Sequence, residues 1–189
     1  IYKTSQIIIN ENVLSLIMDE IVDIVDENDK VIGQELKSKC HSARILHRGT
    51  AILVFKDNFY TKIIIQKRSM KLISKPGKLC IPGGHLSSRE DYITGAKREL
   101  QEELFHEQEL PKEIKFKELF KIKKLKDDDY EFNMVYRVVH VGPFYKDPDE
   151  VENYFFEDIK ETLKKINTEP ESYTETTILL LKEYQKRFM

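Results

Sequence analysis

Apolar residues form short runs in the first third of the chain, and their spacing predicts β-strands. Residues 20–25 fit one strand, the polar residues 26–29 a turn, and residues 31–33 a short returning strand. Two later runs, 49–55 and 61–66, are rich in β-branched residues and flank a segment that opens with a polar turn. We therefore expect these two runs to form a hairpin or two neighbouring strands.

The apolar spacing changes to that of a helix after a Pro-Gly-Gly turn at residues 82–84. We expect this helix to cover residues 90–104. Ser87 or Ser88 can cap it, because Glu90 follows Ser87 at the spacing of a capping box.

The remaining apolar runs predict further strands and two C-terminal helices. The expected strands are 79–81, 114–125 and 130–141, and the expected helices are 156–166 and 171–188. Strands and helices follow each other without strict alternation. This order predicts an α+β fold, a sandwich in which helices pack on a mixed sheet.

The composition favours a globular protein of a reducing compartment. Of the 189 residues, 40% are hydrophobic and 34% are charged. The net charge of −2 gives no electrostatic reason to expect nucleic acid or an anionic membrane as a partner, and the longest apolar runs are too short to span a bilayer. Two cysteines, Cys40 and Cys80, do not suggest a disulfide scaffold. We expect a cytoplasmic protein, and its oligomeric state stays open.

The first residues of the chain do not share the orderly pattern that follows them. Residues 1–17 precede Met18, which can be an internal start. We expect 1–17 to be an N-terminal extension that pairs on the sheet or packs as a helix. Residues 18–189 carry no Pro/Gly/Ser linker or internal repeat, so we expect them to form one domain.

Three glutamates on the predicted helix are the strongest indication of chemistry. Glu99, Glu102 and Glu103 are spaced i, i+3 and i+4, so they share one helical face. Like charges at these spacings cost a helix roughly 0.2–0.5 kcal/mol per pair. A divalent cation can offset that cost, and Mg²⁺ is usually held by a few carboxylates together with substrate phosphates. A salt-bridged surface helix is the alternative explanation, but it does not account for the preceding Pro-Gly-Gly turn.

The spacing from Gly84 through Glu90 and Arg98 to these glutamates resembles the Nudix box, a loop–helix–loop that binds metal and a diphosphate. The resemblance implies a Nudix-like α/β/α sandwich with a mixed β-sheet. It implies Mg²⁺, with Mn²⁺ as an alternative, bound by Glu99, Glu102, Glu103 and the carbonyl of Gly83. Gly84, Glu90 and Arg98 then have structural roles, with Arg98 and Glu90 as an ion pair.

The same resemblance suggests which groups take part in catalysis. Glu99 and Glu103 are the candidates on the helix, and Glu131 on a neighbouring strand is a second candidate for the general base. Lys67 and Arg68 can contact the substrate phosphates. For Glu131, Lys67 and Arg68, a solvated position at the surface is an equally good explanation.

Two flanking segments are similar to one branch of the superfamily, the type I isopentenyl-diphosphate isomerases and the hydrolases built like them. These segments are residues 19–49 and a tail made of residues 153–158 and 169–174. In that branch, His85 sits where the isomerase has a metal-binding histidine, and His41 and His47 lie in the segment that supplies two more. A lone histidine is more often structural or solvated than a metal ligand. Substrate binding is a further role that we assign to His85.

Several residues depart from these patterns. The isomerase places a catalytic cysteine at the position of Gly83, whereas Cys80 lies three residues earlier and is better explained as a small buried hydrophobe. The chain has no tryptophan, which the isomerase uses against a carbocation. Phe105 replaces a glycine of the box, so the chain must leave the helix differently.

We therefore expect an enzyme, a Nudix-type pyrophosphohydrolase. It would cleave a diphosphate linkage in a nucleoside diphosphate derivative or a related small-molecule pyrophosphate. An isopentenyl-diphosphate isomerase and a non-catalytic nucleotide-binding module are the alternatives. The sequence does not identify the substrate.

Overall fold

The computed structural model describes residues 19–126 and 129–189, so the predicted extension 1–17 lies outside the described residues. Eight strands of the described chain form one mixed sheet. In chain order the elements are β1 (Ile21–Val25), β2 (Val31–Leu36), α2 (Lys37–Ala43), β3 (His47–Phe55), β4 (Lys62–Arg68), β5 (Leu79–Cys80), α3 (Tyr92–Leu104), β6 (Lys117–Lys126), β7 (Asp129–Val139), β8 (Val151–Asp158), α4 (Ile159–Thr168), a 3₁₀ turn (Pro170–Ser172) and α5 (Glu175–Phe188).

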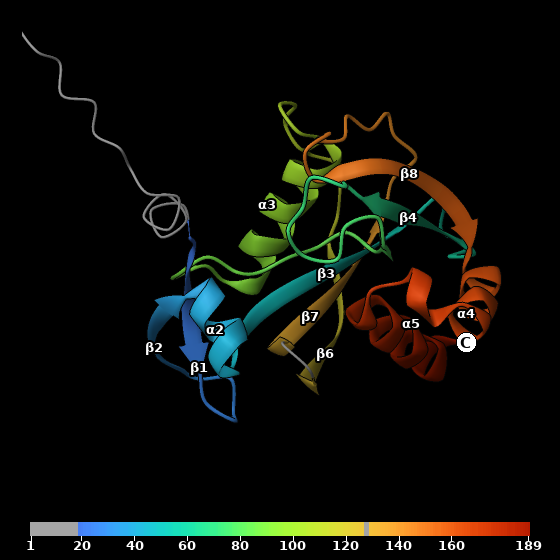
Figure 1. Cartoon of the computed structure of the whole chain (residues 1–189). Coiled ribbons are helices and arrows are strands. Elements are labelled where there is room, and N and C mark those ends of the chain that lie inside the picture. Colours follow the sequence, from blue (N-terminus) through green and yellow to red (C-terminus); the bar gives the residue numbers. More distant parts are fainter. Residues whose placement is uncertain (1–18, 127–128) are drawn as a thin grey trace, which may run out of the picture.

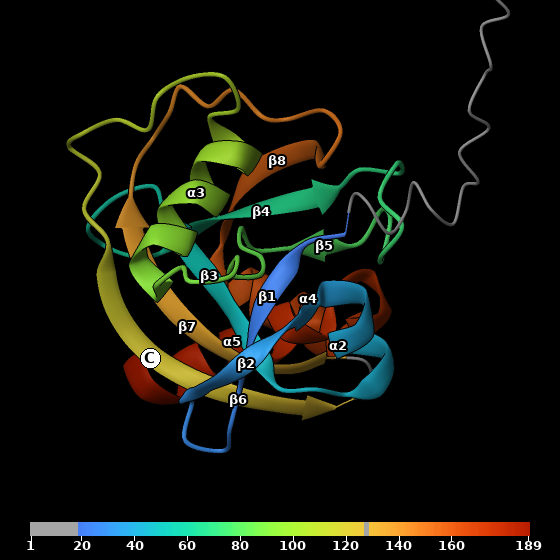
Figure 2. The ribbon, with the colours of Figure 1, turned by 90° about the vertical axis from the view of Figure 1, so that its left-hand side faces the viewer.

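Helices cover both faces of this sheet, as Figures 1 and 2 show. On one face, α3 contributes Ala96, Leu100 and Leu104 to a buried cluster with apolar residues of β3, β4 and β7. On the other face, α4 and α5 pack on a second buried cluster. The predicted α+β sandwich, with helices packed on a mixed sheet, is therefore confirmed.

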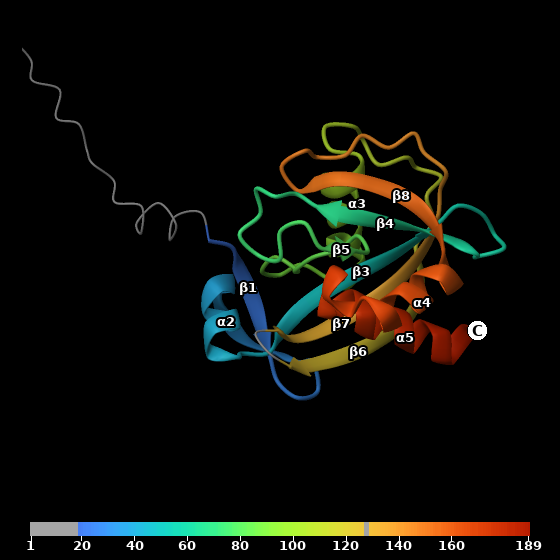
Figure 3. The ribbon, with the colours of Figure 1, turned by 45° about the vertical axis from the view of Figure 1, so that its right-hand side comes forward.

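The centre of the sheet is a long parallel pair between β3 and β7. Their register runs from His47 opposite Glu131 to Phe55 opposite Val139. The N-terminal hairpin β1–β2 and helix α2 lie at the end of the sheet where β3 begins (Figure 3). This arrangement brings the starts of β3 and β7 close to α2.

The predicted Nudix-box helix is present, but its cap is not a serine. Helix α3 begins at Tyr92, and the side chain of Asp91 caps it by accepting a hydrogen bond from Thr94 N. Glu90 instead accepts a hydrogen bond from Ser87 N at 2.9 Å, inside the loop before the helix. Glu90 is therefore a loop residue, two positions before the helix starts.

The C-terminal predictions were wrong at the boundaries. Residues 156–158 end strand β8, where we expected a helix, and α4 starts only after Asp158, which caps it. Residues 171–174 precede α5, which begins at Glu175 with Thr174 as its cap. Strand β8 hydrogen-bonds to β4, so tertiary pairing overrides the helical pattern of this segment.

The end of α3 shows how the chain accommodates Phe105 in place of glycine. Phe105 is the C-cap residue of α3, with φ −121°, and the following His106 adopts the left-handed conformation with φ 46°. The carbonyls of Glu103 and Leu104 accept hydrogen bonds from the backbone N–H groups of Asp147 and Tyr145. The loop before β8 thus supplies donors that the helix end lacks, and the Phe105 ring is buried.

No helix in residues 19–126 and 129–189 is long and apolar enough to cross a membrane.

Candidate active site

Helix α3 presents two buried carboxylates and one exposed carboxylate along one face. Glu99 and Glu103 are 9% and 4% exposed, whereas Glu102 is exposed. The Oε2 atom of Glu103 accepts a hydrogen bond from Gly83 N at 2.9 Å. The loop before the helix and the last turn of the helix therefore close on each other at this point.

Burial gives these acids a high proton affinity. It raises the pKa of Glu99 to about 7, against the effect of the neighbouring Arg98 guanidinium. Burial also raises the pKa of Glu103 well above its usual range, and the nearby Glu99 charge adds to this effect. Two adjacent buried acids with perturbed pKa values mark a candidate functional site, and carboxylate oxygens suit a hard ion such as Mg²⁺.

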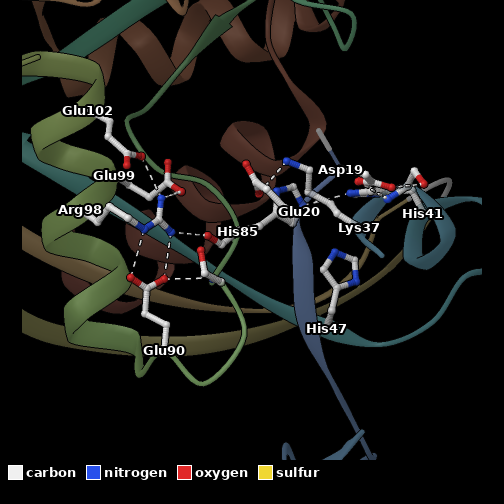
Figure 4. A network of polar contacts seen from close by, with 12 residues as sticks. Asp19, Glu20, Lys37, His41, His47, His85, Glu90, Arg98, Glu99 and Glu102 are labelled. Atoms are coloured by element: carbon white, nitrogen blue, oxygen red, sulfur yellow. Dashed lines mark hydrogen bonds and ion pairs between the residues drawn. The ribbon is translucent and has the colours of Figure 1, made fainter. Parts of the chain in front are cut away.

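Arg98 connects the carboxylates to the loop (Figure 4). Its guanidinium donates two hydrogen bonds to Glu90, at 3.0 and 2.9 Å. It also donates to Glu99 at 2.9 Å, to Glu102 at 2.8 Å and to the carbonyl of His85 at 2.8 Å. With all these donors engaged inside the protein, Arg98 braces the loop against the helix rather than facing a ligand.

Gly83 and Gly84 lie so close to neighbouring atoms that there is no room for a side chain at either position. A Cβ atom on Gly84 would lie 2.4 Å from Oε2 of Glu99. A Cβ atom on Gly83 would lie 2.2 Å from the carbonyl oxygen of Thr50, and the φ of Gly83 is +139°, which L side chains rarely adopt. The glycines let the loop approach both β3 and the carboxylates of α3.

A second cluster of possible ligands lies at the start of the β3–β7 pair. His41 of α2, His47 of β3, His85 of the loop and Glu131 of β7 place one ligand atom each within 4.8 Å of one another. Nε2 of His85 lies 3.1 Å from Nε2 of His41 and 3.0 Å from Oε1 of Glu131. Nε2 of His47 lies 3.6 Å from the same carboxylate oxygen.

The protonation state of His47 leaves the lone pair of its Nε2 atom available to bind a metal ion. Nδ1 of His47 lies 2.9 Å from the carbonyl of Ile45, so Nδ1 donates and Nε2 is the unprotonated nitrogen. That Nε2 is buried and has no hydrogen-bond partner in the described part of the chain. Burial lowers the pKa of His47 to about 4, so its ring is neutral near pH 7. Burial disfavours the charge of Glu131, but His85 and His47 hold the pKa of this carboxyl well below its usual range.

The two sets of donors differ in chemistry. Three imidazole nitrogens and one carboxylate oxygen suit a transition-metal ion such as Zn²⁺, Mn²⁺ or Fe²⁺. The α3 carboxylates offer only oxygen. The residues therefore fit two different metal centres. His85 directly follows Gly83 and Gly84 in the chain, and these glycines lie beside the α3 carboxylates.

The model of the NUDIX domain matches residues 45–177, which is more than half of the chain. The chain belongs to the Nudix family. Nudix enzymes generally use divalent metal ions, and Nudix hydrolases act on small-molecule pyrophosphates.

Relatives of this Nudix protein fall into two groups. It is 41% identical over 86 residues to an uncharacterised Nudix hydrolase of Yersinia pestis, and this stretch covers 45% of the chain and 46% of the relative. It is 26% identical over 170 residues to an isopentenyl-diphosphate Delta-isomerase of Serratia proteamaculans, covering 88% of the chain and 92% of the relative. The match thus spans about half the length of the Yersinia protein.

Solved structures show the same fold. DR0079 of Deinococcus radiodurans superimposes with a TM-score of 0.73 at 20% identity, covering 87% of this chain and 98% of that protein. A MutT NUDIX hydrolase of Burkholderia pseudomallei gives a TM-score of 0.55 at 19% identity, with 72% and 96% covered. At 20% and 19% identity, these likenesses show the shared fold and do not specify a substrate.

The structure separates several residues that the sequence had grouped for this Nudix protein. Glu131 lies in the histidine cluster, where its carboxylate contacts His85 and Asn133. Lys67 shares its face of β4 with residues turned toward α4 and α5, and its ammonium binds Glu152 at 2.9 Å. The guanidinium of Arg68 donates to the carbonyl of Ser74. In the described part of the chain, neither cation contacts the three α3 glutamates.

One cationic side chain near the site, that of Lys37, was not predicted from the sequence. Lys37 stands one helical turn before His41 on α2, and its ammonium binds Glu20 at 2.8 Å (Figure 4). Partial burial and the charge of Lys37 both disfavour protonation of the half-buried His85, but Glu131 outweighs them and the pKa of His85 is raised. The i, i+4 spacing of Lys37 and His41 was visible in the sequence, but only the fold shows that α2 faces the loop that carries His85.

Proposed function

We propose that this chain is a metal-dependent hydrolase that cleaves a diphosphate linkage in a nucleoside diphosphate derivative or a related pyrophosphate. The buried pair of Glu99 and Glu103 beside Gly83 carries the proposal. Two acids with raised pKa values at 9% and 4% exposure are costly for a protein without a cation to bind. Family membership supports the same class of reaction.

The proposed roles follow from the position of each group. Glu99, Glu102, Glu103 and the carbonyl of Gly83 would hold Mg²⁺, or Mn²⁺ in its place. The flanking carbonyls of Pro82 and Gly84 accept hydrogen bonds from Ile52 N and Thr50 N, at 2.8 Å each. When bound, the metal acidifies water and neutralises charge on the departing phosphate.

Glu99 is the better candidate for the general base on α3. A base is most effective when its pKa lies near the working pH, and in the metal-free site burial raises the pKa of Glu99 to about 7. Glu99 would take this role in place of binding the metal. Glu103 is tied to Gly83 N, which suits a ligand held in one orientation. Glu131 stays ionised inside the histidine cluster, and its carboxylate contacts His85 and not a group on α3.

Lys37 is our candidate for contact with the substrate phosphates. Its charge acts on His85, and its present partner Glu20 is 54% exposed at the side chain, so the pair can open to an anion. Arg68 remains a weaker candidate, because release of the Ser74 carbonyl is needed before it can contact a phosphate.

A product assay tests the proposed function. Purified protein would be incubated with Mg²⁺ and a panel of nucleoside di- and triphosphates, dinucleoside polyphosphates and nucleotide sugars. We expect release of phosphate or a monophosphate that Glu103→Gln abolishes. A calorimetric titration that shows nucleotide binding without turnover would instead support a non-catalytic binding module.

The histidine cluster favours isopentenyl-diphosphate isomerase as a second candidate, together with the 92% coverage of the Serratia enzyme. Three features of the chain oppose it. Gly83 offers no thiol, and its backbone conformation excludes a side chain. Cys80 is buried, and burial raises the pKa of its thiol to about 12. The 189 residues include no tryptophan. Conversion of isopentenyl diphosphate by the purified protein, with metal and a reductant, would decide for the isomerase.

A further inference from the structure

Asn133 of β7 is buried beside the histidine cluster, and no catalytic role explains it. It is 3% exposed and follows Glu131 by two residues, so both side chains lie on the same face of the strand. In the parallel register, Asn133 lies opposite Gly49 just as Glu131 lies opposite His47.

The amide of Asn133 fixes the orientation of the Glu131 carboxylate. Its Nδ2 donates to Oε2 of Glu131 at 2.8 Å. With Oε2 held, the other oxygen, Oε1, is turned toward the imidazoles of His85 and His47, at 3.0 and 3.6 Å. An ionised carboxylate only accepts hydrogen bonds, so a donor is needed to hold one of its oxygens. The Asn133 amide donates to Oε2 of Glu131 and leaves Oε1 to the two histidines.

The backbone opposite Asn133 is shaped around the same pair of side chains. A Cβ atom on Gly49 would lie 2.7 Å from Oδ1 of Asn133 and 3.2 Å from Oε2 of Glu131. Glycine at this position of β3 therefore leaves the space that the amide and the carboxylate occupy. This space and the hydrogen bond are two separate observations that point to one arrangement.

We propose that Asn133 is a positioning residue for a transition-metal ion at His41, His47, His85 and Glu131. This inference rests on the second metal centre described above. Hydrogen-bond partners of metal ligands typically account for 10- to 100-fold in metal affinity. Loss of the Asn133 amide is therefore expected to weaken metal binding at the histidine cluster and to leave the α3 carboxylates unaffected.

Co²⁺ is the probe, because its visible spectrum reports the donors that bind it. The protein would be titrated with Co²⁺ in competition with a chelator, as wild type and as Asn133→Leu, which keeps a similar shape but removes the donor. Thr50→Val is the matched control. It removes another buried hydrogen bond of the β3–β7 pair, from Thr50 Oγ1 to the carbonyl of Met134 at 3.2 Å, without touching the cluster.

We expect Asn133→Leu to bind Co²⁺ about 10- to 100-fold more weakly than wild type, with Thr50→Val close to wild type. Equal affinities of Asn133→Leu and wild type would overturn the proposal, as would a wild type with no Co²⁺ spectrum. If Asn133→Leu does not fold, Gly49→Ala serves instead, because its Cβ displaces the same amide, and unchanged affinity there would equally refute the role.

Hydrolysis is measured separately in the same preparations. Glu103→Gln is expected to lose Mg²⁺-dependent turnover and to keep its Co²⁺ spectrum. Failure of the hydrolase proposal therefore leaves the Co²⁺ result readable, and failure of the Asn133 proposal leaves the turnover result readable.

Discussion

Gly84→Ala is expected to displace a catalytic carboxylate without changing it. The three atoms nearest to a Cβ at this position all belong to Glu99, its Oε2, Cδ and Oε1, at 2.4, 2.6 and 2.7 Å. Real Cβ atoms do not approach other atoms this closely, so the Glu99 carboxylate has to move. It is the end of a flexible side chain, and the backbone of the loop can stay in place.

The expected size of the effect follows from this geometry. A misplacement of about 1 Å at a reacting group costs on the order of 100-fold in rate, which is about 2.7 kcal/mol. The loss of stability should be small, about 1 kcal/mol, at the lower end of the cost of overpacking. For a chain of this length, that corresponds to about 2–4 °C in Tm.

The assay compares Mg²⁺-dependent turnover and thermal unfolding of Gly84→Ala with those of Gly33→Ala. The Cβ of the control meets only the side chain of Ile24, at 3.3 Å, on a strand outside the active site. Adding Glu99→Gln to Gly84→Ala should cost little further activity, because both changes disable the same carboxylate. Wild-type turnover in Gly84→Ala would refute the assignment of Glu99 to the site.

Three further predictions concern protonation, the helix end and the isomerase alternative. Because the folded pKa of Glu99 is raised to about 7 from 4.5, the folded state holds this proton where the unfolded state has lost it. Metal-free wild type should therefore lose stability relative to Glu99→Gln as the pH rises from about 5 to 7. Parallel Tm curves for the two proteins would contradict this. Phe105→Gly restores the residue that the box usually has, yet it should destabilise by about 3–5 kcal/mol in denaturant unfolding, because it removes a buried ring. A loss below about 1 kcal/mol would show that the ring is not packed. Gly83→Cys should not isomerise isopentenyl diphosphate and should unfold at lower temperature, since φ at this position is +139° and the Cβ would lie 2.2 Å from Thr50 O. Isomerisation by this variant would show that the loop can accept a thiol.

The α3 carboxylates were predictable because a helix fixes the positions of its side chains. Glu99, Glu102 and Glu103 needed only local spacing to place them on one face, and Arg98 and Glu90 are joined across a single turn and loop. The sequence therefore located this part of the site without knowledge of the sheet.

The histidine cluster depends on long-range pairing and was only partly predictable. His47 and Glu131 meet because β3 and β7 pair in parallel with these residues in register, although 84 positions separate them in the chain. No local sequence pattern indicates that register or shows that α2 packs close to the starts of β3 and β7. Glu131 was consequently predicted as a base for the carboxylate site, and Asn133 was not singled out.

Strand β8 was missed for a related reason. Its residues include acidic positions at both ends, and its burial is uneven along its length. Hydrogen bonding to β4 fixes this strand, and β4 lies far earlier in the chain. A pattern of local apolar spacing does not contain that contact.

We propose that the buried carboxylates of α3 hold the metal that drives cleavage of a diphosphate. The most direct test is Mg²⁺-dependent release of phosphate or monophosphate by wild type, Glu103→Gln and Glu107→Gln. Glu107 is an exposed glutamate just beyond the helix and serves as the matched control. We expect turnover by wild type and Glu107→Gln and a loss of about 100-fold or more in Glu103→Gln. Equal turnover by all three proteins would contradict it.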